Sequence, residues 1–331
     1  MEKKIRVAIV GASGLVGRKV LEILAEKNLP IDEYVLFASA RSAGKTMEFS
    51  GKNYILQELK DDSFDSGFNY AIFSAGSKTS EHFAPLAVKA GCLVIDNSSA
   101  FRMKENVPLI VPEVNKEEIK NNQGIIANPN CTTIPATVVL KPLDDRNHIK
   151  RIVFSTYQAA SGAGQKGIDD LMNGMLAQAP IKFPHPLYNN CLPHIDDFLP
   201  DGYTKEEIKM IEETRKILKR PDLRITSTNI RVPVLNCHSE TINVEFERDF
   251  DLAEVKTLLQ ESPGIIIQDD SENYVYPMPL SADDKDEVFV GRLRRDTSVD
   301  YGLNMWIVSD NVRKGAATNA IQILEELLKE E

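Results

Sequence analysis

The sequence predicts a two-domain α/β protein, in which a doubly wound parallel-sheet domain is joined to an α+β domain with a mixed or antiparallel sheet. Two observations support this prediction. The chain has 331 residues, and at roughly 100–200 residues per domain this length suggests two domains. Strands and helices alternate in its first part, whereas runs of strands dominate its later part.

The first domain begins with a strand, a glycine-rich turn and a helix. Residues 5–10 form a β-branched run that ends at Gly11, and residues 15–25 carry apolar side chains at helical spacing. Further elements are predicted as a helix at 80–90 and apolar strands at 34–38, 70–74, 92–95 and 124–127. Strands that are apolar throughout and alternate with helices are typical of a parallel sheet covered on both faces. We therefore expect a Rossmann-like domain.

The second domain is predicted from strands that partly alternate in polarity, at 151–160, 223–234, 241–248, 287–293 and 303–308. The prolines between residues 180 and 200 predict an irregular segment, either a loop or an interface arm. An amphipathic helix is predicted from Gly315 to the end of the chain and is expected to pack back on the first domain. We therefore assign residues 1–130 with 310–331 to the first domain and residues 131–309 to the second.

Composition and charge narrow the classes of function. Lysine and arginine total 39 against 49 acidic residues, a formal net charge of −10, which argues against nucleic acid or an anionic membrane as the main partner. The N-terminus lacks the apolar core of a signal peptide and no stretch is long enough to span a bilayer, so we predict a cytoplasmic protein. The cysteines include no Cys-x-x-Cys pair, which fits a reducing compartment. We predict no metal, because Cys191 and His194 are the one short-spaced pair in the proline-rich segment.

The glycine-rich turn after the first strand predicts a dinucleotide site. Its spacing is G-x-x-G-x-x-G, and it directly follows a strand and opens a helix. In that context backbone N–H groups approach a pyrophosphate at the helix N-terminus. A tight turn between packed elements is the alternative. The predicted cofactor residues here are Gly11, Ala12, Ser13, Gly14, Leu15, Val16 and Gly17.

The residues after the second strand favour NADP over NAD. An Asp or Glu in this place would bind the 2′-hydroxyl of NAD, but the sequence offers Ser39, Arg41 and Ser42 instead. A guanidinium donates paired, charge-assisted hydrogen bonds to a phosphate. The alternative is a solvated loop arginine.

A cysteine, a histidine and an arginine are candidates for the chemistry. Cys131 lies between an apolar strand and a predicted helix start, where the partial positive charge of the helix stabilises a thiolate. His238 follows a predicted strand that carries Arg231. A cysteine with a distant histidine suits covalent acyl chemistry, with the arginine binding a carboxylate. From spacing alone, an inert buried cysteine and a structural histidine stay open as alternatives.

Motifs along nearly the whole chain resemble those of the aspartate-β-semialdehyde dehydrogenase family. In order they are GASGLVG, SSAFRM, NPNCTT, STYQAASGAG, KEEIKMIEET, RVPVLNCHSE and SDNVRKGAATNA. The combination of NPNCTT, YQAASGAG and RVPV followed by HSE is highly specific. The resemblance implies a homodimer or homotetramer assembled through the second domain.

The resemblance also implies a role for each matched residue. Cys131 resembles the thiol nucleophile, His238 the acid/base and Gln158 the amide that orients the acyl intermediate. Substrate binding is implied for Arg231 at the α-carboxylate, Glu206 at the amine, Arg102 and Lys209 at the phosphate, and Asn130. NADP binding is implied for Ser161, Gly162 and Asn311 as well. On their spacing alone, Glu206 and Lys209 would be a surface ion pair. Cys237 stands where we expect glycine or another small residue.

The implied reaction is the NADPH-dependent reduction of L-4-aspartyl phosphate to L-aspartate 4-semialdehyde through a thioester at Cys131, with release of phosphate. It belongs to the biosynthesis of lysine through diaminopimelate and of threonine, methionine and isoleucine; the reverse direction is a phosphorylating oxidation. One alternative is an N-acetyl-γ-glutamyl-phosphate reductase, although its cysteine motif differs from NPNCTT and its acetylated amine would leave Glu206 without a partner. Another is a catalytically silent NADP-binding regulatory protein.

Overall fold

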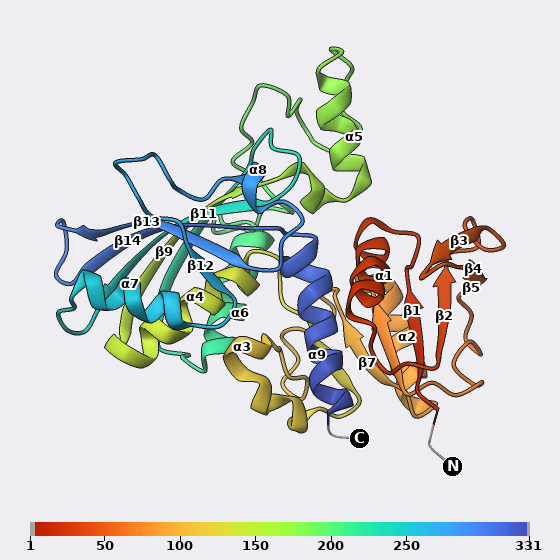
Figure 1. Ribbon diagram of the computed structural model, residues 1–331. Helices are drawn as coiled ribbons and strands as arrows, with labels where there is room; N and C mark the ends of the chain where they lie inside the picture. Colours follow the sequence, from red (N-terminus) through yellow and green to blue (C-terminus); the bar gives the residue numbers. More distant parts are fainter. Residues whose placement is uncertain (1–3, 330–331) are drawn as a thin grey trace. The chain divides into compact units, whose positions relative to one another are not determined.

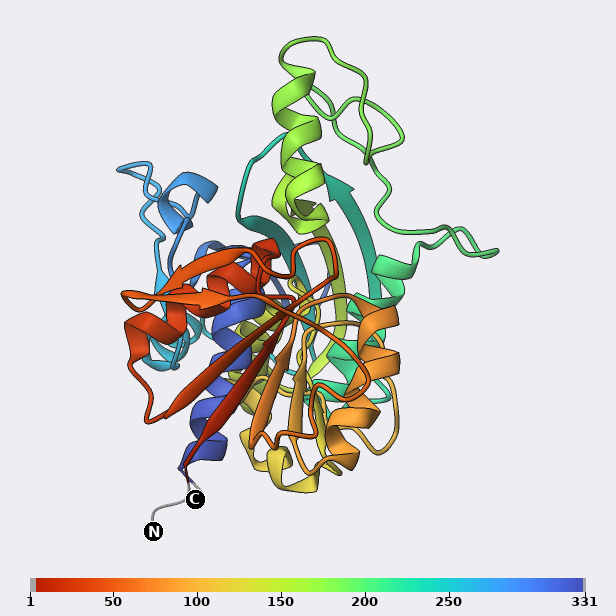
Figure 2. The same ribbon diagram turned by 90° about the vertical axis from the view of Figure 1, so that its right-hand side faces the viewer.

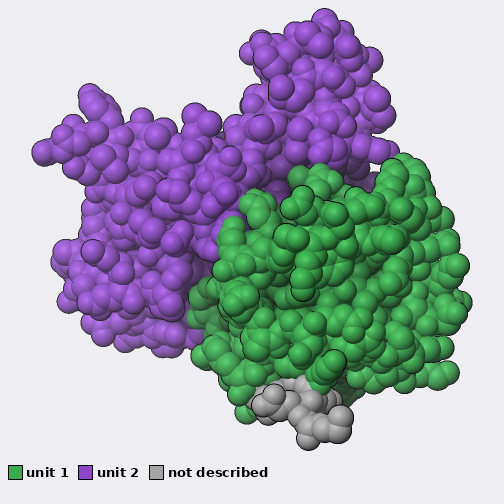
Figure 3. All heavy atoms as spheres, turned by 45° about the vertical axis from the view of Figure 1, so that its right-hand side comes forward, with its two compact units in different colours: residues 1–129, 316–331 green, residues 130–315 purple. Residues whose placement is uncertain are grey.

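The computed structural model describes residues 4–329, which fall into two compact units. Residues 1–129 with 316–331 form the first unit and residues 130–315 form the second, as coloured in Figure 3. The sequence places the corresponding divisions after residue 130 and before residue 310. Within the described range, no helix combines the length and the apolar character needed to cross a membrane.

The first unit is built on a six-stranded parallel sheet with the strand order β5-β2-β1-β6-β7-β8 (Figure 2). Its strands are β1 (Arg6–Val10), β2 (Glu33–Ala38), β5 (Gln57–Glu58), β6 (Tyr70–Phe73), β7 (Leu93–Asp96) and β8 (Ile125–Ala127). The chain runs from β1 to β2 on one side and later returns to β6 on the other side of β1. The carboxyl ends of β1 and β6 therefore form the switch point at which such sheets bind ligands. This sheet confirms the predicted doubly wound domain.

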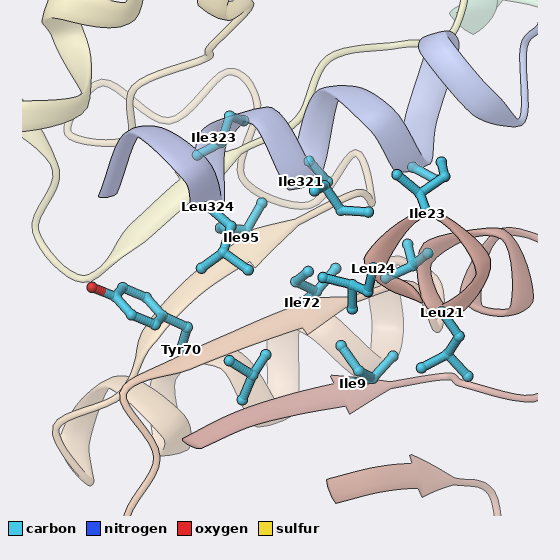
Figure 4. Close-up of a cluster of buried hydrophobic side chains, with 14 of the residues drawn as sticks. Ile9, Leu21, Ile23, Leu24, Tyr70, Ile72, Ile95, Ile321, Ile323 and Leu324 are labelled. Atoms are coloured by element: carbon cyan, nitrogen blue, oxygen red, sulfur yellow. The ribbon is translucent and has the colours of Figure 1, made fainter. Parts of the chain in front are cut away.

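Helices cover both faces of this sheet. They are α1 (Leu15–Lys27), α2 (Ser77–Lys89), α3 (Pro112–Asn115), a 3₁₀ turn (Lys116–Asn121) and α9 (Asn319–Leu328). On one face Ile9, Ile72 and Ile95 of the sheet belong to a buried cluster with α1 and α9, as Figure 4 shows. On the other face Phe37 and Phe73 pack in a separate cluster with α2. Both faces are thus apolar, which explains why the strands are apolar throughout.

The C-terminal segment departs from the predicted continuous helix. Arg313–Thr318 forms a π-helical turn, and the α-helix begins at Asn319. A Cβ at Gly315 would lie 3.0 Å from the carbonyl oxygen of Cys131, so the backbone passes close to that residue. Such turns occur frequently at functional sites. The hairpin of β3 (Thr46–Phe49) and β4 (Lys52–Ile55) was also not predicted, because each strand has only four residues and most of their side chains are not buried.

The second unit contains a six-stranded sheet with the order β10-β9-β11-β14-β13-β12. Its strands are β9 (Ile149–Gln158), β10 (Arg224–Arg231), β11 (His238–Phe246), β12 (Ile265–Ile267), β13 (Val288–Asp296) and β14 (Gly302–Ser309). β9 and β10 are parallel, as are β12 and β13, and the other pairs are antiparallel. The prediction of a mixed or antiparallel sheet is confirmed, and the sheet is mixed. β11 begins at His238 rather than at residue 241, because the buried polar residues at its start do not alternate with exposed ones.

Besides the short α8 (Pro279–Ala282), which contacts β14, three helices contact this mixed sheet: α4 (Thr133–Asn147), α6 (Lys205–Leu218) and α7 (Leu252–Glu261). Figure 1 shows these three on the same face of the sheet. The other helical elements of the unit are a 3₁₀ turn (Ala160–Ala163) and α5 (Gln165–Gly174). Residues 180–200, all of them described, form neither a helix nor an extended strand, as predicted.

Candidate active site

A thiol and an imidazole meet at one edge of the mixed sheet. Sγ of Cys131 lies 3.2 Å from Nε2 of His238, although the residues are 107 positions apart. The other ring nitrogen, Nδ1, accepts a hydrogen bond from the backbone N–H of Ala159 at 3.0 Å. Because Nδ1 is an acceptor, the proton of the neutral imidazole is on Nε2. The geometry therefore makes His238 a hydrogen-bond donor toward a Cys131 thiolate.

His238 is held in its neutral form. Burial, together with the nearby charge of Arg231, lowers the pKa of its imidazole well below the ordinary value. Protonation of Nδ1 would also break the hydrogen bond from Ala159. The imidazole therefore stays neutral around pH 7.

Cys131 directly precedes the cap of α4, the position that the sequence predicts. Oδ1 of Asn130 accepts hydrogen bonds from the backbone N–H of Thr132 at 3.0 Å and from its hydroxyl at 2.8 Å, which fixes the turn into the helix. Pro135 lies in the first helical turn, where its missing N–H has no helical partner to lose. The positive end of α4 favours a thiolate at Cys131.

The register of three neighbouring strands brings more of the predicted residues to the same edge. Gln158 ends β9 and is paired with Arg231, which ends β10. His238 begins β11, the other neighbour of β9. All three side chains are buried. Strand order, rather than proximity in sequence, therefore assembles this part of the site.

Arg231 is oriented by the same residue that orients His238. Its Nη1 donates a hydrogen bond of 2.7 Å to the carbonyl oxygen of Ala159. Burial lowers the pKa of Arg231, while the negative charges of Glu206 and Cys131 act in the opposite direction. A buried guanidinium with a fixed orientation is suited to a two-point contact with a carboxylate.

Helix α6 contributes a buried carboxylate rather than an exposed ion pair. Glu206 is 6% exposed, and its Oε1 accepts from the side-chain amides of Asn130 at 3.0 Å and Gln158 at 3.4 Å. Its Oε2 accepts from Lys209 at 3.2 Å, and Lys209 also donates to Asp196 at 2.6 Å. Burial lowers the pKa of Lys209, but these two carboxylates raise it above the ordinary value. Lys209 therefore remains a cation.

Several residues of this edge were not identified from the sequence. Oε2 of Glu213 accepts the backbone N–H of Asn130 at 2.6 Å, and the backbone of Ala159 holds both the imidazole and the guanidinium. The sequence does contain an indication of the position of Glu213. This residue follows Glu206 by seven positions on α6 and therefore lies on the same helical face. Gly315 carried no comparable signal, because its contact with Cys131 depends on the tertiary path of the chain.

The three predicted cofactor residues of the second unit lie in two different surroundings. Nδ2 of Asn311 donates to the hydroxyl of Ser161 at 3.0 Å, and both residues are buried. Gly162 lies instead against the candidate catalytic groups. A Cβ there would be 2.8 Å from Nη1 of Arg231 and 3.0 Å from Cε1 of His238, so a side chain at this position would displace them.

In the first unit, the glycine-rich turn lies at the switch point of the parallel sheet. A Cβ at Gly11 would lie 2.6 Å from the carbonyl oxygen of Ser74, and one at Gly17 would lie 2.2 Å from the carbonyl oxygen of Gly11. Close packing of β1, α1 and the end of β6 therefore requires glycine. The rest of the predicted set forms the turn and the first residues of α1: Ala12, Ser13, Gly14, Leu15 and Val16. The first N–H groups of α1, which have no partners within the helix, are suited to bind a pyrophosphate.

The predicted phosphate ligands of the first unit differ in how firmly they are held. Ser39 and Arg41 are exposed and Ser42 is half-buried, and among residues 4–329 no acidic side chain forms an ion pair with Arg41. Arg102 is buried instead, and its guanidinium donates to the carbonyl oxygens of Asn128 and Asn97, both at 2.9 Å.

Cys237 adopts a left-handed backbone conformation with φ +70, which explains why glycine was expected at this position. Its thiol lies close to the carboxylates of Asp283 and Asp310, so that one possible metal-binding atom from each residue lies within 4.8 Å of the others. The Asp310 carboxylate, however, accepts four hydrogen bonds, from Asn236 and from three backbone N–H groups. Burial and the two carboxylates raise the pKa of the Cys237 thiol. This arrangement fits an inert thiol, and we assign no metal to it.

A second row of buried polar residues lies next to the row that carries Arg231 and Gln158. Glu240 on β11 is paired in register with Thr156 on β9, which is paired with Asn229 on β10. Each has a buried side-chain atom without a hydrogen-bond partner among the described residues, and for Glu240 this holds for both carboxyl oxygens. Burial raises the pKa of Glu240 well above its ordinary value, which favours the protonated carboxyl over the carboxylate.

Fold and site together define the class of protein. The family description "Semialdehyde dehydrogenase, NAD binding domain" matches residues 6–122, and "Semialdehyde dehydrogenase, dimerisation domain" matches residues 140–314. An aspartate-semialdehyde dehydrogenase from Aquifex aeolicus is 52% identical to the chain over 98% of both sequences. The chain therefore belongs to the aspartate-semialdehyde dehydrogenase family, a family of oxidoreductases, which confirms the resemblance seen in its motifs.

Solved structures show the same similarity. The crystal structure of aspartate semialdehyde dehydrogenase II from Vibrio cholerae, complexed with ASA, is 44% identical with a TM-score of 0.95, and 99% of each chain is covered. An aspartate semialdehyde dehydrogenase from Candida albicans with NADP is 25% identical with a TM-score of 0.79, and 98% of each chain is covered. These similarities extend over both units, so the fold is shared over nearly the whole chain.

Proposed function

We propose that this chain is a cytoplasmic, NADP-dependent, phosphorylating aspartate-semialdehyde dehydrogenase that interconverts L-4-aspartyl phosphate and L-aspartate 4-semialdehyde. The observation that carries the proposal is the Cys131–His238 pair, with Sγ and Nε2 3.2 Å apart, at an edge that also holds Arg231, Glu206 and Lys209. The substrate has a carboxylate, an ammonium group and a phosphate, whose charges are complementary to these three side chains. The names of the relatives support the same substrate.

Cys131 is the proposed nucleophile. Its thiolate attacks the acyl carbon, the carbon–sulfur bond of a thioester forms, and the bond to the phosphate oxygen breaks with its electron pair leaving on phosphate. The Nε2–H of His238 donates to the carbonyl oxygen when that oxygen becomes negative, and the Gln158 amide is a second candidate donor. Because Nδ1 accepts from Ala159, the imidazole stabilises this charge while it keeps its own proton.

Substrate binding is divided among fixed side chains. Arg231 binds the α-carboxylate, and Glu206, which already accepts hydrogen bonds from two amides and Lys209, binds the ammonium group. Lys209 and Arg102 are the proposed cations for phosphate, and Asn130 positions Glu206 through its side-chain amide. Since Lys209 is paired with Asp196, phosphate has to compete with that carboxylate.

The residues of the first unit fit NADP. Glycines that exclude any side chain leave backbone N–H groups accessible at the start of α1, and the exposed Arg41 with Ser39 and Ser42 suits a 2′-phosphate. Ser161, Gly162 and Asn311 are further proposed contacts. When bound, the nicotinamide supplies or accepts the hydride that interconverts thioester and aldehyde.

The test is the rate of NADPH formation from aspartate semialdehyde and NADP, measured by absorbance with and without inorganic phosphate. Phosphate-dependent formation of NADPH is expected, because phosphate releases the acyl group from the thioester. If the folded protein forms no NADPH under either condition, the proposal is wrong.

We also propose that the chain forms a homodimer through the exposed surface of its mixed sheet. A groove of about 510 Å³ there is lined by residues that include Tyr276, Met278 and Trp306, and the nearby Leu280 is 94% exposed. Burial of such apolar surface stabilises a protein interface. Light scattering after size-exclusion chromatography is expected to give the mass of a dimer, and Leu280→Asp to shift it toward the monomer.

A further inference from the structure

The irregular segment between α5 and α6 is attached to Arg231 at two points. Leu192 and Arg231 exchange both backbone hydrogen bonds, with N···O distances of 2.9 and 2.8 Å. Earlier in the segment, the centre of the Phe183 ring lies 5.8 Å from Cζ of the Arg231 guanidinium. We call residues 181–192 the strap.

Asp170 of α5 anchors the start of the strap. Its Oδ1 accepts the backbone N–H of Ile181 at 2.8 Å, and its Oδ2 accepts those of Lys182 at 2.7 Å and Phe183 at 2.8 Å. The carboxylate is almost completely buried, with 4% of the residue exposed. Three charge-assisted bonds from consecutive residues hold the backbone of the strap in one conformation.

The Phe183 ring is positioned by packing as well. It packs against a buried apolar cluster formed by Ala160, Leu171, Leu187 and Leu192. On α5, a Cβ at Gly167 would lie 3.2 Å from Cζ of the ring, so the helix approaches the ring closely. The ring is therefore held between α5 and the Arg231 side chain.

We propose that Asp170 and Phe183 are positioning residues for substrate recognition: Asp170 fixes the strap, and Phe183 covers one side of the Arg231 guanidinium so that it meets the substrate carboxylate in a dry, preoriented state. This inference rests on the proposed function, which assigns Arg231 to the α-carboxylate. The face of an aromatic ring attracts a cation, and exclusion of water strengthens an ion pair. Because the strap contacts Arg231, its loss weakens substrate binding more than the chemical step.

Steady-state kinetics of conservative variants test this role. We expect Phe183→Leu, which keeps an apolar side chain but removes the ring face, to raise KM for aspartate semialdehyde about tenfold. Asp170→Asn is also expected to raise KM for aspartate semialdehyde about tenfold. In both variants, kcat and KM for NADP should stay within about twofold of the wild-type values. Asp169→Asn is the matched control, because Asp169 is the exposed neighbour on α5 and pairs with Gln165.

Limited proteolysis tests the anchor independently of activity. Lys182 is exposed, and trypsin cleavage after it requires local release of the strap. Asp170→Asn is expected to be cleaved there at least about tenfold faster than the wild type and Asp169→Asn.

Wild-type KM in Phe183→Leu and Asp170→Asn, or a loss confined to kcat, would overturn the proposal. If the wild-type protein has no phosphate-dependent activity, the proposed function fails instead. The cleavage rates after Lys182 would then still decide whether Asp170 holds the strap.

Discussion

The edge around Cys131 in the second unit and the glycine-rich turn in the first unit differ in how many of their polar groups are already bonded within the protein. At the edge, Nδ1 of His238, Nη1 of Arg231 and both oxygens of Glu206 have partners on neighbouring elements. At the turn, helix-start N–H groups and the exposed Arg41 are available to a ligand. Groups that react must keep one orientation and one protonation state, whereas a site for an exchangeable cofactor must keep its donors accessible.

The largest effect is expected from Cys131→Ser. Because a serine hydroxyl is not ionised at neutral pH and cannot replace the thiolate, phosphate-dependent NADPH formation should fall at least about 10⁴-fold. The Kd for NADP, measured by calorimetry, should be unchanged, since the turn is not affected. Activity within tenfold of the wild type would exclude Cys131 as the nucleophile.

Glycine substitutions compare the two regions directly. Gly162→Ala is expected to lower kcat/KM for aspartate semialdehyde about 100-fold, because the new methyl group would displace Arg231 and His238. Gly17→Ala is its counterpart in the turn and should weaken NADP binding, since its Cβ would collide with the carbonyl oxygen of Gly11. An unchanged Kd for NADP in Gly162→Ala would contradict the proposed contact of Gly162 with the cofactor, and an unchanged kcat/KM would contradict its role beside Arg231 and His238.

A smaller effect is expected from Arg41→Ala. Loss of one charge-assisted contact to the 2′-phosphate should raise KM for NADP about tenfold and leave KM for NAD unchanged. Lys52→Ala, another exposed cation of the first unit, serves as the control. An equal rise of KM for NADP and for NAD would show that Arg41 does not bind the 2′-phosphate.

The smallest effect concerns Glu240 and is a dependence of stability on pH. The folded protein holds a proton on this buried carboxyl that the unfolded chain releases above about pH 4.3, so this residue makes the wild type less stable as pH rises. Glu240→Gln has no proton to release at this position, so it does not lose stability from this source as pH rises. The stability of this variant relative to the wild type, measured by urea unfolding, should therefore increase as the pH rises above about 4.3, by at most about 1.4 kcal/mol per pH unit. A constant difference would contradict a neutral Glu240, and the exposed Glu247→Gln should show no such trend.

The elements that the sequence predicted best are those with a simple burial pattern. Strands such as Tyr70–Phe73 are buried at every position, and α1 has a regular apolar face, so their patterns reveal them. The predicted start of β11 at residue 241 was wrong, because His238 and Glu240 are polar residues in buried positions of that strand. Sequence alone does not show that sheet neighbours will bury a histidine or a carboxyl group.

The candidate site was predictable where one local signal was sufficient. Cys131 lies at a helix start that its flanking residues indicate, and the glycine turn follows directly from its context. The contributions of Ala159 and Glu213 were not predictable, since a backbone group carries no residue-specific signal and the partner of Glu213 is set by tertiary packing. The roles of the matched residues remain predictions that the variants above test.

Helix α9 places the last described part of the chain in the buried core of the first unit, where Ile321 and Leu324 belong to the same cluster as Ile9. During synthesis on the ribosome, that core cannot be completed until α9 has left the exit tunnel. Residues 130–315 form a continuous unit that is fully synthesised earlier. Synthesis of the first unit therefore begins before that of the second unit but is completed after it. The strands of the first unit are made long before α9, the helix that completes their core.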